Sequence, residues 1–327
     1  MRRVRRTALS LVLGALLLLV PFVGGSLAAS DTTAPVLHSL SFPANPILFG
    51  DGHDERITLR VSDDSSGLVY INVTISGPGG ATVEGSRSQS VGPPSYDVTV
   101  DLPFFRLGAP SGIWTLTQIT IRDSAGNTAT YEQSDLEAMG VPTTVEARRF
   151  SDVTLVDPYF TQIDDLAARG IIGGYTLGNF GPNDPVKRAQ FAKMIVGTLG
   201  ITLGSSTATR FTDLGLPDAN GYPHKYVQAA YDHGITTGVT ATTFKPYLNI
   251  TRAQLITMVA RAANLPEPPP DYSPGFGNFS STHYQTARKA AYAGLLDGLP
   301  GMGPGYRFLD YATRGEVCVI LYNLLHR

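Results

Sequence analysis

The chain has 327 residues, and its 25 Lys and Arg residues nearly balance its 27 Asp and Glu residues. No basic cluster follows the first six residues, so neither nucleic acid nor an anionic membrane surface is a predicted partner. Cys318 is the single cysteine, which excludes an intramolecular disulfide. Because it lies in an apolar run, we expect a small buried hydrophobic residue rather than a reactive thiol.

Residues 1–28 have the three parts of a secretory signal peptide. Four arginines lie among the first six residues, an apolar run covers 9–23, and Ser26-Leu27-Ala28 is a small-x-small cleavage site. The alternative is a transmembrane anchor, but about 15 apolar residues are too few to cross a bilayer. Removing the four arginines leaves 21 basic residues against 27 acidic ones, a net charge near −6. The mature chain is therefore predicted to be exported and to have no membrane segment.

Residues 30–145 are predicted to form an all-β domain. Several short segments are rich in β-branched and aromatic residues with partial alternation, and turn-forming residues separate them. These segments are 57–61, 68–75, 96–100 and 113–121. Short strands at this spacing, with no helical stretch between them, indicate a β-sandwich.

Short motifs in this half resemble those of bacterial immunoglobulin-like surface domains. They are Asp31-Thr-Thr-Ala-Pro35, Asp63-Asp-Ser-Ser-Gly67, Gly112-Ile-Trp114 and Asp123-Ser-Ala-Gly-Asn127. The acidic turns raise a calcium hypothesis, because carboxylate oxygens are the ligands that a hard cation needs. The competing interpretation is that Asp, Asn, Ser and Gly are simply turn formers. No D-x-D-x-D-G loop is present, so turn formation is preferred and no metal site is predicted.

The rest of the chain has helical periodicity and repeats itself three times, over 150–201, 210–265 and 275–327. Each unit begins with Phe-x-Asp or Phe-x-Asn and continues with an apolar helix pattern that ends at a pair of glycines. A second Phe and an Arg at the start of another helix follow. The arginines are Arg188, Arg252 and Arg314, and they lie 64 and then 62 residues apart.

These landmarks resemble S-layer homology domains, three in tandem. The resemblance implies a mostly α-helical module in which three repeats build one pseudo-threefold unit. It also implies binding of cell-wall polysaccharide, notably anionic secondary polymers that carry pyruvate ketals. The predicted fold class is therefore multidomain, with an N-terminal all-β immunoglobulin-like sandwich and a C-terminal S-layer homology module.

The arginines occupy an electrostatically unfavourable position. Thr251 with Gln254 and Thr313 with Glu316 have capping-box spacing, which places Arg252 and Arg314 at the first helical residue. A cation there opposes the helix dipole by about 0.3–1 kcal/mol. Free backbone N–H groups and a guanidinium would together suit a carboxylate, such as that of a pyruvate ketal. The alternative is that each Arg pairs with a Phe-x-Asp carboxylate.

Within each repeat, glycines would let a sugar approach the backbone, and the aspartates would bind hydroxyls or orient the Arg. The predicted glycan-binding residues are Arg188, Arg252, Arg314, Asp152, Asp213, Gly174, Gly238 and Gly298. The third repeat departs from the pattern, with Asn278 in place of Asp and Asp310 in place of Pro. We therefore expect the site that depends on Arg252 to be the strongest and the one that depends on Arg314 to be the weakest.

The sequence contains no H-E-x-x-H, no G-x-S-x-G and no Cys/His pair. The predicted protein is therefore not an enzyme and needs no cofactor. Its expected function is non-covalent anchoring to cell-wall polysaccharide at the cell surface. Two alternatives stay open: a glycan-active surface enzyme with catalysis in the N-terminal domain, and attachment of an outer envelope to peptidoglycan. The sugar, the number of working sites and the oligomeric state cannot be predicted from the sequence.

Overall fold

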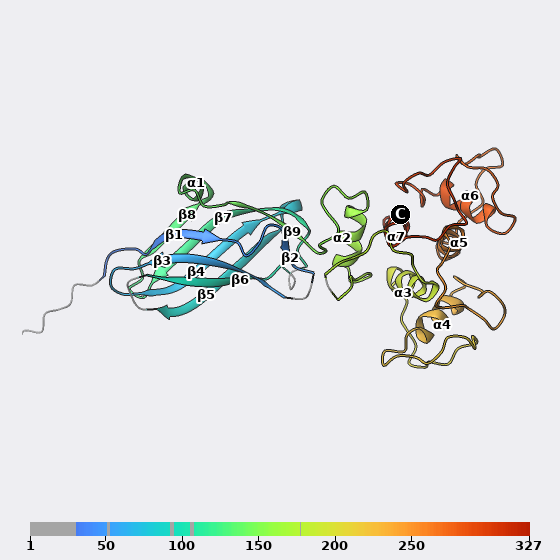
Figure 1. The fold of residues 1–327 in the computed structure, drawn as a ribbon, viewed down its shortest axis with the longest axis horizontal. Coiled ribbons are helices and arrows are strands. Elements are labelled where there is room, and N and C mark those ends of the chain that lie inside the picture. Colours follow the sequence, from blue (N-terminus) through green and yellow to red (C-terminus); the bar gives the residue numbers. More distant parts are fainter. Residues whose placement is uncertain (1–30, 51–52, 92–94, 105–107, 177) are drawn as a thin grey trace, which may run out of the picture.

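The computed structural model describes residues 31–50, 53–91, 95–104, 108–176 and 178–327. The predicted signal peptide, 1–28, lies outside the described residues. Two separate hydrophobic cores divide the chain, one within 37–147 and one within 150–321. Figure 1 shows the resulting elongated shape, with β-strands at one end, helices at the other and α2 (Phe160–Ala168) next to the strands.

The β half consists of two sheets. One has the strand order β1-β3-β6, and the other has the order β2-β9-β7-β4-β5, with β8 also paired to β7. Every pair is antiparallel except β2 with β9. The strands are β1 (Val36–Ser41), β2 (Ile47–Leu48), β3 (Glu55–Ser62), β4 (Leu68–Ser76), β5 (Thr82–Val91), β6 (Ser95–Leu102), β7 (Gly112–Asp123), β8 (Thr128–Glu132) and β9 (Thr144–Arg148).

Alternation along the strands builds one core between the sheets. On β3, Ile57, Leu59 and Val61 are fully buried, while the residues between them are not. Because side chains alternate across a sheet, this pattern turns one face of β3 toward the opposite sheet. Trp114 on β7 is also fully buried, and its indole Nε1 donates to the carbonyl of Pro110 at 3.1 Å. The expected β-sheet organisation of this half is confirmed.

Two details differ from the sequence prediction. A short helix, α1 (Gln133–Ala138), follows β8, where no helix is expected. Six residues are too few to show helical periodicity, and the turn is fixed by Leu136, which is fully buried, and by Asp135, which accepts from the N–H of Glu132. The sheet also continues through β9 to Arg148, three residues beyond the expected boundary at 145.

The helical half consists of three helix pairs that are consecutive in the sequence: α2 and α3 (Arg188–Thr198), α4 (His224–Asp232) and α5 (Arg252–Ala262), and α6 (Tyr284–Tyr292) and α7 (Arg314–Leu325). The main packing is between these pairs, with α2 against α7, α3 against α4 and α5 against α6. The first helix of each pair ends just before a glycine with positive φ, as the pattern predicts. These glycines are Gly170, Gly234 and Gly294, with φ of 69°, 69° and 74°. Cys318 on α7 is fully buried, and its pKa is raised by burial, so it is the inert hydrophobic residue expected.

The three helix pairs close into a ring around a small backbone motif. The N–H of Val186 donates to the carbonyl of Ala312, that of Ala312 to Ile250, and that of Ile250 back to Val186, at 3.1, 2.9 and 2.8 Å. All three residues are at most 1% exposed. One segment from each unit therefore meets the other two at a common centre, which makes the three units one structure.

A buried cluster joins the two halves. Asp164 on α2 pairs with Arg149 at 2.9 Å, and it also accepts from the hydroxyl and N–H of Ser111, next to the start of β7. Arg149 is 8% exposed and donates further to the carbonyl of Ala109 at 2.5 Å. A charged pair that is enclosed and hydrogen-bonded on both sides fixes the orientation of α2 against the sheets.

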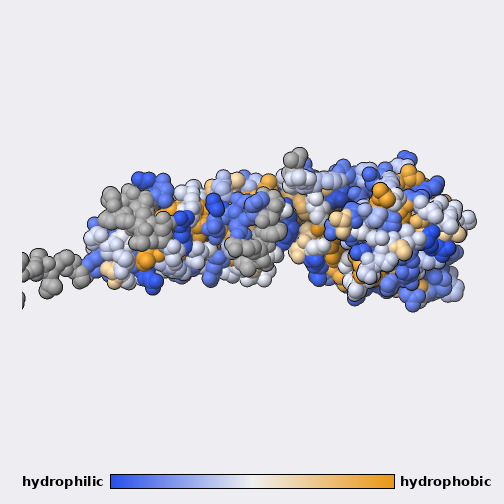
Figure 2. Space-filling model, turned by 90° about the horizontal axis from the view of Figure 1, so that it is seen from below, coloured by the Kyte–Doolittle hydropathy of each residue, from blue (hydrophilic) through white to orange (hydrophobic). Residues whose placement is uncertain are grey.

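The surface shown in Figure 2 carries hydrophobic residues in small patches separated by hydrophilic ones, over both halves. None of the helices within the described ranges is both long enough and apolar enough to cross a bilayer.

Candidate functional site

The second helix of each unit begins at the expected arginine. Arg252 is the first residue of α5, where Thr251 and Gln254 form the capping box. Arg314 begins α7 in the same way, with Thr313 and Glu316. The helix starts and their caps are therefore confirmed.

The N–H groups beside the arginines are not free, so that part of the prediction is wrong. In each of these helices, the first two N–H groups donate to carbonyls in a loop of another unit. Arg188 and Ala189 donate to Leu248 and Pro246, Arg252 and Ala253 to Asp310 and Phe308, and Arg314 and Gly315 to Asp184 and Pro182. The helix ends are filled by the protein's own backbone, which leaves no room there for an anion.

The arginine side chains also donate to backbone carbonyls of the neighbouring unit. The Nε atoms of Arg188 and Arg314 donate to the carbonyls of Phe244 and Phe180, at 2.8 and 2.7 Å. Arg252 donates from Nη1 to the carbonyl of Arg307 at 3.2 Å. The first unit thus reaches the second, the second reaches the third, and the third returns to the first across 134 residues. We call these three contacts the junctions.

The Phe-x-Asp carboxylates hold loops and do not pair with the arginines. Asp152 accepts from the N–H groups of Phe180 and Gly181, both at 2.7 Å. Asp213 accepts in the same way from Phe244 and Lys245. No ion pair joins either aspartate to an arginine among the described residues, so the predicted alternative pairing is wrong. The aspartates instead position the carbonyls that receive the arginines.

Asn278 in the third unit does not take this role, because its side chain accepts from the N–H of Ser280.

The predicted glycines are required by the fold itself. A Cβ on Gly174 would lie 2.6 Å from the carbonyl oxygen of Asn179 and 2.7 Å from the ring of Phe150. Gly238 has a φ of 80°, and a Cβ there would lie 2.5 Å from the ring of Phe211. Gly298 has a φ of 79° but no such close neighbour. Close approach to the backbone does occur at the first two glycines, and the approaching group is the protein's own phenylalanine.

Two junctions carry an open groove beside the arginine. Groove 1 has a volume of about 360 Å³ and is lined by Arg314, the turn 171–174, Gln190, Lys193, Met194, Asp218 and Tyr222. Groove 2 has a volume of about 340 Å³ and is lined by Arg188, the turn 236–239, Gln254, Thr257, Met258, Arg261, Thr282 and His283. Each groove thus combines the arginine of one unit with the glycine turn and second helix of the next, and with the start of the unit after that.

The third junction is closed by its own side chains. Arg252 forms an ion pair with Glu316 at 2.7 Å, and the Glu316 side chain is 4% exposed. Tyr306 lies over the guanidinium at 4.8 Å and within 3.4 Å of the carboxylate. The ring of Tyr159, which is 9% exposed, packs so closely against Gly315 that a Cβ there would lie 2.4 Å away. At this junction the arginine is paired with a buried carboxylate, whereas neutral Gln190 and Gln254 line grooves 1 and 2 at the corresponding position.

The arginines differ in how many donors they have left. All three guanidinium nitrogens of Arg252 are engaged, by Glu316 and by the carbonyl of Arg307. Within the described structure, Nη2 of Arg188 and Nη1 of Arg314 have no hydrogen-bond partner, although each residue has two other bonds. Grooves 1 and 2 therefore each offer a guanidinium donor that the protein does not use.

The electrostatic environments of Arg188 and Arg252 also differ. Burial lowers the pKa of Arg188 from its ordinary value, which reflects a poorly solvated cation. Burial also acts to lower the pKa of Arg252, but the hydrogen bond and charge of Glu316 outweigh it and raise that pKa. Lys193 adds a second cation to groove 1 and Arg261 adds one to groove 2. Groove 1 also contains the carboxylate of Asp218, which accepts from the N–H groups of Asn220 and Tyr222 rather than from Arg314. The arginines of both grooves can therefore attract an anion, whereas Arg252 is already paired with one.

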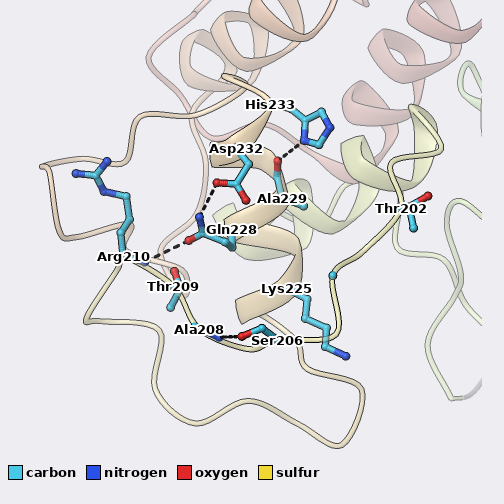
Figure 3. Close-up of a pocket in the computed structure, with 11 residues that line it drawn as sticks. Thr202, Ser206, Ala208, Thr209, Arg210, Lys225, Gln228, Ala229, Asp232 and His233 are labelled. Carbon is cyan, nitrogen blue, oxygen red and sulfur yellow. Dashed lines mark hydrogen bonds between the residues drawn. The ribbon is translucent and has the colours of Figure 1, made fainter.

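A wider hollow of about 510 Å³ lies away from the junctions, between α4 and residues 202–210 (Figure 3). Its polar side chains bond mainly to one another and to the backbone. Gln228 accepts from the N–H of Arg210 and donates to Asp232, and His233 bonds the carbonyl of Ala229. No bond is drawn to Lys225, which extends away from α4. The hollow lacks the convergent unpaired donors of the two grooves.

Comparison with known proteins identifies part of the helical half. Residues 149–192 and 215–256 match the S-layer homology domain. These two S-layer homology segments contain α2, α4 and the first turns of α3 and α5, and neither segment extends to α6 or α7.

Curated relatives share part of the chain. An endoglucanase from Bacillus sp. (strain KSM-635) is 35% identical over 184 residues, 54% of this chain and 18% of that enzyme. The surface layer protein of Brevibacillus choshinensis is 34% identical over 100 residues, 30% of this chain and 9% of that protein. An amylopullulanase from Thermoanaerobacterium thermosulfurigenes is 29% identical over 173 residues, 50% of this chain and 9% of that enzyme. The chain spans less than a fifth of the length of each of these relatives. Among solved structures, Cwp6 from Clostridium difficile aligns over 42% of this chain and 27% of its own, at 12% identity and a TM-score of 0.25.

Proposed function

We propose that the chain is an exported surface protein anchored non-covalently to cell-wall polysaccharide by three S-layer homology repeats, 150–201, 210–265 and 275–327. The matched segments and the surface layer relative support the first two repeats and the location. The third helix pair supports the third repeat, because Ala312 completes the central backbone ring and Arg314 reaches the first unit. Three units closed in this way correspond to one pseudo-threefold module.

The ligand chemistry follows from the unused guanidinium donors in grooves 1 and 2, and this observation carries the proposal. An Arg nitrogen in a partly dry groove forms charge-assisted hydrogen bonds with a carboxylate. A pyruvate ketal supplies one carboxylate on an otherwise neutral sugar, and Lys193 or Arg261 would strengthen its attraction. The adjacent turns offer backbone to the sugar hydroxyls. Grooves 1 and 2 are the proposed sites, and Arg252 serves the fold.

The β half is proposed to be an immunoglobulin-like sandwich that acts as a spacer or interaction domain. Its strand order supports this interpretation. If β1, β3 and β6 are strands A, B and E, then β4, β5 and β7 are C, C′ and F, and β8 with β9 forms a divided G. The three-stranded sheet and the G-F-C-C′ order are those of immunoglobulin domains with an added C′ strand.

We propose a binding protein rather than an enzyme, although two of the relatives are named as glycan-degrading enzymes. Those matches cover at most 18% of the enzymes, so most of each enzyme has no counterpart here. In the β half, Asp63 and Asp123 are at most 5% exposed and bound by backbone N–H groups. Glycoside hydrolysis needs two carboxyl groups facing a sugar in an open groove. An enclosed cluster is a poor candidate for that chemistry.

The proposal is tested by sedimentation of the chain, expressed without residues 1–28, with purified cell walls. We compare native walls, walls from which pyruvate has been removed chemically, and walls stripped of the secondary polymer. Binding should fall on the second and be lost on the third. Binding retained on stripped walls would favour peptidoglycan as the ligand.

A matched pair of double variants locates the binding surface. Lys193→Ala with Arg261→Ala removes one cation from each groove, and neither residue is needed by the central ring. Lys225→Ala with Arg169→Ala removes the same charge from the hollow in Figure 3 and from α2. The first variant should bind walls at least about tenfold more weakly, and the second should bind normally, because one charged hydrogen bond is worth roughly 1.5–3 kcal/mol. The reverse result would move the site to the hollow.

A further inference from the structure

Three carboxylates from separate segments meet at one end of the β half. Asp31 precedes β1, Asp63 follows β3, and Asp123 is the last residue of β7. One oxygen from each lies within 4.8 Å of the others. Since β7 begins beside Asp164 and rises about 3.4 Å per residue, this cluster lies roughly 35 Å from the contact with α2.

Five of the six carboxylate oxygens have hydrogen-bond donors. Asp31 accepts from the N–H groups of Thr33 and Ser66. Asp123 accepts from the N–H groups of Gly126 and Asn127 and from the Asn127 amide. These bonds alone would be consistent with ordinary turn formation.

The sixth oxygen is the exception that turn formation does not explain. Asp63 is 5% exposed, and its Oδ2 accepts from the N–H of Gly67 at 2.5 Å. Its Oδ1 is buried and has no hydrogen-bond partner. A buried anionic oxygen without a donor is costly, and two further carboxylates beside it increase the cost. No Lys, Arg or His in the described ranges forms an ion pair with any of the three.

From this arrangement we infer that Asp31, Asp63 and Asp123 form a calcium-binding site. Oxygens that share one Ca²⁺ lie about 2.3–2.6 Å from the ion, so they can be up to roughly 5 Å apart, which matches the cluster. The ion would give Asp63 Oδ1 its missing partner and offset two of the three negative charges. It would also tie the segment before β1 to the β3–β4 and β7–β8 turns. The calcium hypothesis that the sequence alone disfavours is thus revived by geometry that brings the two acidic turns together with Asp31.

The test is calcium titration of the full chain, expressed without residues 1–28, by calorimetry and thermal unfolding after treatment with EDTA. We expect one calcium per chain, with a dissociation constant of about 0.1–1 mM, as is typical of extracellular modules. Calcium at 10 mM should raise the melting temperature of the β half by several degrees, because it binds only the folded state. Magnesium at the same concentration should have a smaller effect, since it demands near-ideal octahedral geometry.

Matched substitutions separate this site from a general salt effect. Asp63→Asn should weaken calcium binding at least about tenfold, while Asp64→Asn changes an adjacent exposed acid and should leave binding intact. Asp31→Asn gives a second test if Asp63→Asn does not fold, because Asp31 is less buried. No heat of binding and no thermal shift in the unsubstituted chain would overturn the inference. So would equal responses of the Asp63→Asn and Asp64→Asn variants.

Discussion

Groove 2 and the third junction each contain an arginine at the first position of a helix, but the two arginines have different partners. Arg188 and Arg252 each begin a helix and reach a loop of the following unit. The residue that Arg188 meets on the next helix is Gln254, a neutral acceptor, whereas Arg252 meets Glu316. The amide leaves Nη2 of Arg188 unused, whereas the carboxylate engages both Nε and Nη2 of Arg252. In our proposal, a repeated arginine therefore serves a binding site or a structural ion pair according to its partner in the neighbouring repeat.

The largest effect is expected for Arg252→Ala. This change leaves Glu316 charged and 3% exposed without its partner, which should destabilise the helical half by about 3–5 kcal/mol. Wall binding by the folded variant should be unchanged. Chemical denaturation measures the first quantity and wall sedimentation below the melting temperature measures the second. Lost wall binding at unchanged stability would mean that the third junction is a working site.

Arg188→Ala and Arg314→Ala, unlike Arg252→Ala, should weaken wall binding. Each removes the guanidinium from an open groove, so wall affinity should fall by roughly 10- to 150-fold for the groove concerned. Some stability will also be lost, because carbonyls of the neighbouring unit lose their donor. Arg252→Ala is the matched control, with the same substitution at the same helical position. If all three variants bind walls equally, the distinction between open and closed junctions has no functional meaning.

Glu316→Gln sharpens the comparison by giving the third junction the residue found at 190 and 254. The charged pair becomes a neutral hydrogen bond, and we expect a loss of about 1.5 kcal/mol, less than for Arg252→Ala. Tyr306 and Tyr159 still fill the space, so no wall affinity should be gained. A gain would show that the carboxylate alone closes this junction.

The smallest expected effect is a dependence of stability on pH that arises from His283 in groove 2. Burial and then the charge of Arg261 lower the pKa of His283 below its ordinary value. The unfolded chain therefore binds the proton more tightly, and stability should be full above about pH 6.5 and decrease as the pH falls below it. Melting temperatures between pH 7.5 and 5 should show a slope that His283→Gln reduces. An equal slope in the variant would assign the effect to other groups.

Local features of the helical half were predictable from sequence, and the pairing of its units was not. Capping boxes and glycine ends depend on residues within four positions of each other, so Thr251, Gln254 and Gly234 sufficed. The junctions depend on contacts between residues 55 to 134 positions apart. Because each Arg serves the loop of the next unit, the irregular loop of the third repeat affects Arg252 rather than Arg314. The expected ranking of these two arginines is therefore reversed in our proposal.

The same limit applies to the β half. The β3, β4, β6 and β7 strands were predictable from β-branched alternation, while the exposed β8 and the short α1 have too little pattern. The acidic turns were visible as motifs, but Asp31, Asp63 and Asp123 are brought together only by strand pairing. No spacing rule in the sequence reports the unpaired oxygen of Asp63.

The central ring of Val186, Ile250 and Ala312 restricts how the number of repeats can change. Open repeat arrays grow or shrink by one unit, because each unit contacts only its neighbours and the two ends carry capping units. Here the central segment of each unit donates to one of the other two and accepts from the remaining one. Loss or gain of a single unit would leave a buried N–H and a buried carbonyl without partners, so viable variants in repeat number should come in multiples of three.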